Sequence, residues 1–81
     1  MHDEAAIRAR IAENIRFLRE KKGYTQDKFA EIAKAGEKDY GEIERGKRNI
    51  TISKLVRIAK VLEVAPGSLI EKDYASESPI D

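Results

Sequence analysis

The side chains that could do chemistry in this chain are acidic and basic groups crowded between residues 37 and 49. Acid–base catalysis is not predicted, because Asp39, Glu42 and Glu44 have no partner nucleophile, no metal ligand and no glycine-rich phosphate loop. The chain has no cysteine and one histidine, His2, which excludes disulfides, thiolate metal sites and His-rich metal sites. A fold of short helices also rarely offers a substrate pocket. We therefore expect no enzyme, no metal site, no cofactor and no small-molecule ligand.

A basic cluster, Lys47 and Arg48, closes the same stretch. Taken alone, it is equally compatible with an ordinary solvated loop. Its position favours another role, because residues 25–49 read as two short helices separated by a tight turn at Ala35-Gly36, and the cluster follows the second helix directly. This layout is typical of a helix-turn-helix, whose second helix enters the major groove of DNA. The pattern therefore predicts that the cluster contacts phosphates.

The composition is that of a globular domain with a heavily charged surface, at 41% hydrophobic and 38% charged residues. The formal net charge is only +1, because residues 73–81 carry three acidic side chains and no basic one. No apolar run approaches the ~20 residues that span a bilayer, and no charged-then-apolar leader is present. We therefore expect a soluble, cytoplasmic protein with no membrane partner.

Five helices are predicted around one core, which makes the fold all-α. The first runs from about Ala5 to Lys22, and the second is capped by Thr25 and closes near Lys34. The third covers about 37–45, the fourth is capped by Thr51, and a short fifth helix follows Pro66. Residues 1–74 form one DNA-binding domain, and residues 75–81 are predicted to be a disordered acidic tail because they show no hydrophobic period.

Apolar residues at helical spacing mark the faces that we expect to be buried. These residues are Ile7, Ile11, Ile15 and Leu18 in the first helix, Phe29, Ala30, Ile32 and Ala33 in the second, Tyr40 and Ile43 in the third, and Ile52, Leu55, Val56, Ala59 and Leu62 in the fourth.

With these elements in place, the chain resembles the phage-repressor (Cro-like) helix-turn-helix family, also called the XRE family. The matching residues are LRE at 18–20, GYTQ at 23–26, Phe29-Ala30, IERGKRN at 43–49, Thr51, Leu55 and IAKVLEV at 58–64. The likeness covers about residues 11–72 and implies a five-helix, repressor-like DNA-binding domain. Within the family, the ERG-x-RN-x-T stretch is most similar to the small controller proteins of restriction–modification systems.

The resemblance implies a role for each matching position. Gln26 corresponds to a phosphate contact at the start of the second helix, and Lys47, Arg48 and Asn49 to a loop that grips the backbone. Arg19 and Glu44 correspond to an ion pair that ties the first helix to the third. The positions at which family members read base edges hold Glu37, Lys38, Asp39 and Glu42.

Three of these four base-reading positions are carboxylates, whereas family members more often carry Ser, Thr, Gln or Arg there. A carboxylate is repelled by phosphate, although Glu or Asp can accept a hydrogen bond from cytosine N4. We therefore expect the third helix to set specificity more by exclusion than by attraction.

The family likeness implies a transcriptional regulator that binds double-stranded DNA, and we expect a homodimer on a pseudo-palindromic operator. The dimer interface is predicted at Val64, Leu69, Ile70 and Tyr74, because an apolar last helix in so small a domain needs cover. Two alternatives stay open. One is a protein-interaction module that keeps the fold but uses the third helix on a protein partner. The other is an N-terminal DNA-binding piece of a larger sensor-regulator, with ASESPID as a linker.

Overall fold

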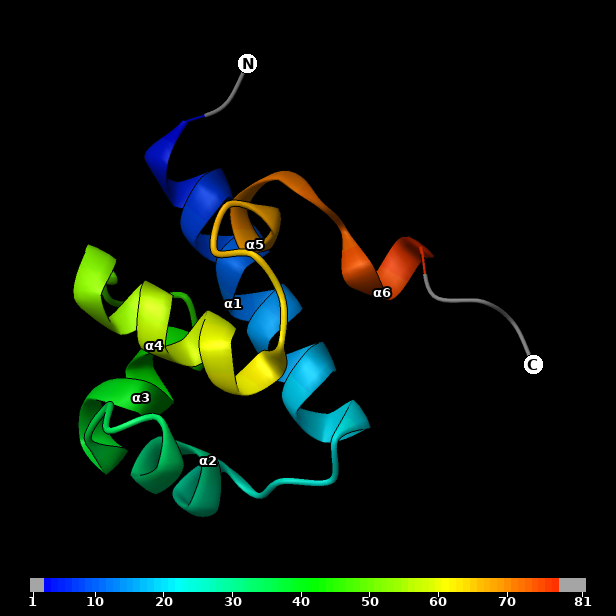
Figure 1. Cartoon of the computed structure of the whole chain (residues 1–81). Coiled ribbons are helices and arrows are strands. Elements are labelled where there is room, and N and C mark those ends of the chain that lie inside the picture. Colours follow the sequence, from blue (N-terminus) through cyan, green and yellow to red (C-terminus); the bar gives the residue numbers. More distant parts are fainter. Residues whose placement is uncertain (1–2, 78–81) are drawn as a thin grey trace.

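The computed structural model describes residues 3–77, and within this range it is all-α, with no strand (Figure 1). Its helices are α1 (Glu4–Lys21), α2 (Gln26–Ile32), α3 (Glu37–Glu44), α4 (Ile52–Leu62), α5 (Ser68–Glu71) and α6 (Tyr74–Glu77). The prediction of an all-α fold is confirmed, and the described chain holds one short helix more than the five expected. Within the same range, none of the helices combines the length and apolar content needed to cross a membrane.

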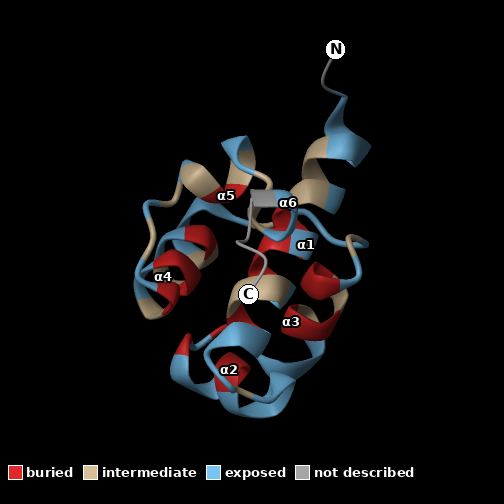
Figure 2. Ribbon diagram, turned by 90° about the vertical axis from the view of Figure 1, so that its right-hand side faces the viewer, coloured by how far each residue is buried: buried red, intermediate tan, exposed pale blue. Residues whose placement is uncertain are grey.

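The long first helix is the scaffold on which the others are mounted. α1 begins at the N-cap Asp3, whose carboxylate accepts a hydrogen bond from the Ala6 amide at 2.7 Å. It packs against α3, α4, α5 and α6, while α2 packs on α3. Each of the first five helices carries buried residues (Figure 2). The core therefore holds α3 in place against α1.

The α2–turn–α3 unit is built from local signals that the sequence carries. Thr25 caps α2 as predicted, accepting from the Lys28 amide at 3.1 Å. Gly36 has a positive φ of 79°, a conformation that suits glycine, and α3 starts at the next residue. The Phe29 ring lies between Tyr24 and Tyr40, at centroid distances of 5.9 and 5.2 Å. These contacts fix the angle between the two helices.

Three residues that were predicted to be buried lie on the surface instead. Ile32 is 39% exposed, Ile52 73% and Val56 47%. Ile32 is the last residue of α2, where the chain already turns away. In α4 the core face is centred on Leu55, Ile58 and Leu62, so Ile52 and Val56 fall on its flank. The prediction that Ile52 and Val56 belong to the buried stripe of α4 is therefore wrong.

The C-terminal segment is organised by a buried polar residue that the hydrophobic pattern does not reveal. Asn14 is fully buried in α1, and its amide donates to the carbonyls of Leu69 at 2.8 Å and Lys72 at 2.7 Å. Its Oδ1 accepts from the Tyr74 amide at 2.9 Å, directly at the start of α6. Residues 75–77 are helical, which differs from the disordered tail predicted to begin at 75, and residues 78–81 of that tail lie outside the described residues.

Candidate nucleic-acid interface

The third helix presents one side to the core and one side to solvent. Its buried residues are Tyr40, Gly41, Ile43 and Glu44. Among the residues assigned to base reading, Glu37 and Lys38 are exposed, and Asp39 and Glu42 are half-buried. All four lie outside the core, as a base-reading surface requires.

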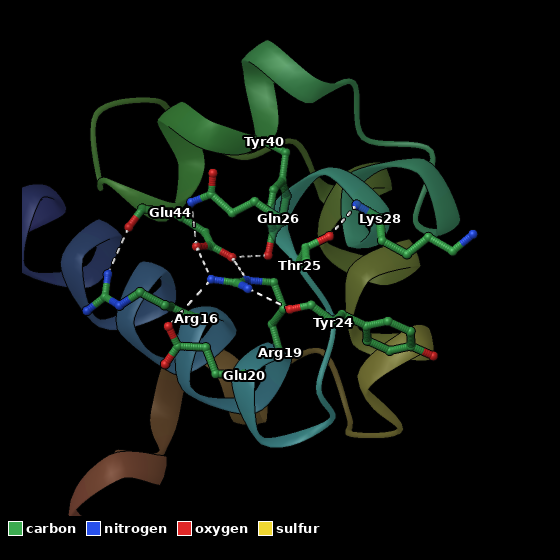
Figure 3. Close-up of polar contacts among 9 residues, drawn as sticks. All are labelled: Arg16, Arg19, Glu20, Tyr24, Thr25, Gln26, Lys28, Tyr40 and Glu44. Atoms are coloured by element: carbon green, nitrogen blue, oxygen red, sulfur yellow. Dashed lines mark hydrogen bonds and ion pairs between the residues drawn. The ribbon is translucent and has the colours of Figure 1, made fainter.

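The structure brings Arg19 and Glu44 together across α1 and α3 (Figure 3). Arg19 Nε donates to Glu44 Oε2 at 2.6 Å, and Nη2 donates to Oε1 at 3.1 Å. The guanidinium also donates to the Tyr24 carbonyl at 2.7 Å, just before α2. Glu44 accepts further hydrogen bonds from Tyr40 Oη and from Gln26 Nε2, the latter at 2.9 Å. One carboxylate thus joins α1, α2 and α3.

Both members of this pair are nearly removed from solvent, at 7% exposure for Arg19 and 2% for Glu44. Burial alone would raise the pKa of Glu44, but the hydrogen bonds from Arg19, Tyr40 and Gln26 outweigh it and hold that pKa below its ordinary value. The hydrogen bond to Glu44 raises the pKa of Arg19, while burial and the neighbouring carboxylate raise the pKa of Tyr40. Glu44 is therefore a charged hub at neutral pH.

Gln26, the residue implied to contact phosphate, is oriented by this hub. One N–H of its amide is used by Glu44. A glutamine amide carries two N–H donors, so the second remains for another acceptor. Gln26 is exposed and lies at the first position of α2, where the helix dipole also favours an anion. The arrangement suits a phosphate oxygen.

The carboxylates of α3 are paired with cations from the segments that follow it. Arg48 donates from Nε to Glu42 Oε1 at 2.8 Å and lies 3.5 Å from Asp39 Oδ1. Lys54 Nζ donates to Asp39 Oδ2 at 3.0 Å. The hydrogen bond from Lys54 and the charge of Arg48 lower the pKa of Asp39. We call Asp39, Glu42, Arg48 and Lys54 the loop-charge cluster; its two positive and two negative charges cancel.

The other loop residues differ in how they are held. Asn49 Oδ1 accepts from Arg8 Nη1 at 2.9 Å, which links the loop to α1, and Arg8 also pairs with Glu4 at 3.1 Å. Lys47 is exposed and has no ion-pair partner within residues 3–77. Within residues 3–77, the loop therefore carries one ion-paired cation, Arg48, and one cation without an ion pair, Lys47.

The prediction that Leu69 lies in a dimer interface is wrong, because this residue is not on the surface. Leu69 is fully buried inside its own subunit, because α5 packs against α1 and directs this side chain into the core. The other three predicted residues, Val64, Ile70 and Tyr74, are half-buried and pack against the core from outside. Tyr74 Oη also donates to Ser68 Oγ at 2.8 Å.

The sequence reasoning did not select Arg45, which lies between the recognition helix and the loop. Arg45 is exposed, and its guanidinium lies close to Gly41 on α3. It forms no ion pair within the described residues. A helical wheel of α3 could have found it, because residues 38, 41 and 45 fall on one row.

Comparisons with known proteins agree with this geometry. A family model described as a helix-turn-helix domain matches residues 12–74. Control protein C.SmaI of Serratia marcescens is 33% identical over 66 residues, which cover 82% of this chain and 79% of that protein.

Solved structures show the same likeness in three dimensions. The restriction-modification controller protein C.AhdI from Aeromonas hydrophila matches with a TM-score of 0.72 and 27% identity, over 76% of this chain and 94% of that chain. An HTH_3 family transcriptional regulator from Vibrio cholerae matches with a TM-score of 0.77 and 27% identity, over 93% of this chain and 40% of that chain. The chain described above therefore belongs to the helix-turn-helix domain family and is an XRE-like, DNA-binding transcriptional regulator.

Proposed function

We propose that this protein binds one specific duplex DNA sequence as a homodimer and controls transcription of a restriction–modification system. The observation that carries the proposal is the Glu44 hub, which locks α3 against α1 and α2 with its outer face exposed. A rigidly held helix followed by a cationic loop is what insertion into a major groove requires. The controller role rests on the likeness to C.SmaI and C.AhdI.

Phosphate contacts set the position of the protein on the duplex. Gln26 offers its free N–H from the start of α2, and Lys47, Arg48 and Asn49 offer donors from the loop after α3. Arg48 leaves Glu42 when a phosphate replaces the carboxylate as its partner. This exchange makes Glu42 a competitor of DNA until the correct base pair offers it a donor such as cytosine N4.

A homodimer places two α3 helices in successive major grooves, roughly 34 Å apart. We place the interface at the outer sides of Val64, Ile70 and Tyr74, which are half-buried and lie near the C-terminal end of α4, on α5 and at the start of α6. The two-fold symmetry of the dimer requires a pseudo-palindromic operator.

Selection from a random duplex library by the full chain tests this proposal. Enriched sequences should contain an inverted repeat with half-sites about one helical turn apart. The control is the double variant Lys47→Ala, Arg48→Ala, which keeps α3 but lacks the loop cations and should enrich much more weakly. If the wild-type protein enriches no sequence at any salt concentration, the proposed function is wrong.

One observation favours a second candidate, a module that binds another protein. Ile52 and Val56 form an exposed apolar pair one turn apart on α4, and such pairs occur at protein interfaces. Salt dependence separates the two functions, because a DNA-binding protein loses affinity for random duplex steeply as salt rises. The match to the Vibrio cholerae regulator, of which this chain covers 40%, is compatible with a third possibility, that the domain belongs to a longer regulator.

A further inference from the structure

Gly41 is a helical residue for which the isolated domain shows no steric need. Its φ is not positive, unlike those of Gly23, Gly36 and Gly46. A Cβ placed at Gly41 would meet only Arg45 Nη1 at 3.6 Å and Gln26 Oε1 at 4.0 Å, which are ordinary contacts with the ends of flexible side chains. Glycine inside a helix is less favourable than alanine. Nothing within the described domain therefore requires glycine at this position.

The side chain that covers Gly41 is Arg45. Positions 38, 41 and 45 are three and four residues apart, so they form one row along α3. Lys38 and Arg45 in this row are exposed, whereas Gly41 is buried. The Arg45 guanidinium lies back over the helix towards Gly41, next to Gln26, the implied phosphate contact. A cation is thus held on the recognition face with no carboxylate to neutralise it within residues 3–77.

Three cations near Arg45 are already engaged, whereas Lys38 and Lys47 form no ion pair within residues 3–77. Arg48 pairs with Glu42, Lys54 pairs with Asp39, and Arg16 donates to the Glu44 carbonyl at 3.1 Å. In contrast, Arg45 can leave its resting place without breaking an ion pair. Its fork of N–H donors matches the O6 and N7 acceptors of guanine in the major groove.

We propose that Arg45 is a specificity-determining residue that reads guanine, and that glycine at position 41 lets the backbone of α3 approach the DNA closely when Arg45 extends. This inference rests on the proposed function, since it requires that α3 enter the major groove. It adds Arg45 to the proposed base-reading residues, beside Lys38. Glu42 holds Arg48 in the free protein and remains the proposed acceptor for cytosine N4 in the complex.

The test uses fluorescence anisotropy with two probes, a duplex selected by the wild-type protein and a random-sequence duplex of equal length. Arg45→Lys keeps the charge but lacks the fork. It should weaken binding to the selected duplex about tenfold and leave binding to random duplex nearly unchanged. Arg45→Gln should weaken binding to the selected duplex further. Lys60→Gln, which removes a charge from the exposed face of α4, is the matched control and should change neither affinity appreciably.

Gly41→Ala tests the second half of the proposal. Alanine favours the helix and meets no close contact, so the urea midpoint should stay the same or rise. Affinity for the selected duplex should nevertheless fall several-fold.

Three results would overturn the inference. Wild-type affinity in both Arg45 variants would show that Arg45 does not contact DNA. An equal loss on both probes in Arg45→Gln, with full rescue by Arg45→Lys, would make it a phosphate contact without sequence specificity. Unchanged affinity of Gly41→Ala for the selected duplex would show that the α3 backbone does not approach the DNA closely at this position. None of these results bears on the proposed function, which is tested by whether the wild-type protein selects a duplex.

Discussion

Arg48 and Glu42 are joined by two contacts to a single oxygen, with Nε and Nη2 of the arginine 2.8 and 2.7 Å from Oε1 of the glutamate. A cation of the loop that we propose to contact the DNA backbone is thus bound to a carboxylate of α3, the proposed recognition helix. The contact is partly exposed, so a phosphate can compete for it. In the proposed complex, a phosphate and Glu42 compete for Arg48, and the first two predictions follow from that competition.

Glu42→Gln should raise affinity for random duplex, because it frees Arg48 and removes a charge that repels phosphate. The difference in affinity between the selected and the random duplex should become smaller, because the carboxylate that accepts from a cytosine amino group is lost. That interaction is worth ~1–3 kcal/mol. Titrations of both duplexes at one fixed salt measure this. Glu37→Gln is the control, because it removes the same charge from an exposed position with no ion pair in the described chain. If both variants behave alike, release of Arg48 is not the cause.

Lys47→Ala and Arg48→Ala should weaken binding to all duplexes and flatten the salt dependence by up to about 0.9 units each. Arg48→Ala should cost more affinity than Lys47→Ala. The reason is that it leaves Glu42 without its cation and Asp39 with only Lys54. Plots of log affinity against log salt for each variant provide the measurement. An unchanged slope in both variants would rule out phosphate contact by this loop.

Glu44→Ala should destabilise the fold by roughly 3–5 kcal/mol, because Arg19 is left as a buried cation without a partner. Tyr40 and Gln26 also lose their acceptor. Lys22→Ala is the control, since its pair with Glu63 is largely exposed and should contribute far less. Urea unfolding at pH 7 measures both losses. Comparable losses in the two variants would show that the Glu44 hub contributes no more than a surface pair.

The same hub should make stability depend on pH in the acid range. The folded pKa of Glu44 lies below its ordinary value of 4.5, so its contribution is complete above that value and disappears as the pH falls through the folded pKa. The urea midpoint of the wild-type protein should therefore drop more steeply between pH 6 and pH 3, about the range in which carboxylates titrate, than that of Glu44→Gln. Parallel curves would mean that Glu44 is not preferentially ionised in the folded state.

Ile70→Glu should convert the protein to a monomer if the proposed interface is right, because it places a charge where two apolar surfaces meet. Val56→Glu, on the exposed flank of α4, is the control and should leave the dimer intact. Sedimentation velocity with and without DNA gives the oligomeric state, and circular dichroism checks that both variants fold. Dissociation by Val56→Glu alone would move the interface to α4.

The fold was largely predictable because its signals are local. Thr25 and Thr51 cap their helices as expected, each accepting a hydrogen bond from the amide three residues later at 3.1 Å. The spacing of Ile11 and Ile15 also identified the buried side of α1. Such signals depend on residues a few positions apart, and a single sequence displays them directly.

What escaped prediction depends on contacts between distant parts of the chain. Asn14 bonds residues 55 to 60 positions away, and an asparagine in a helix gives no hint of such partners. The extent of α4's buried face depends on how the helix is rotated against α1, so Ile52 and Val56 were misplaced. The neutralisation of Asp39 and Glu42 requires the loop to fold back on α3. The sequence alone therefore overstates how strongly the carboxylates of α3 repel phosphate, because Arg48 and Lys54 neutralise two of them in the folded protein.

The most direct test of the central claim is a pair of wild-type titrations, with the selected duplex and with a random duplex, over a series of salt concentrations. We expect log affinity to fall linearly with log salt on both duplexes, and the selected duplex to bind about 10³-fold or more tightly at physiological salt. Equal affinity for the two duplexes, or no binding to either at low salt, would contradict the claim that this domain recognises a specific DNA sequence.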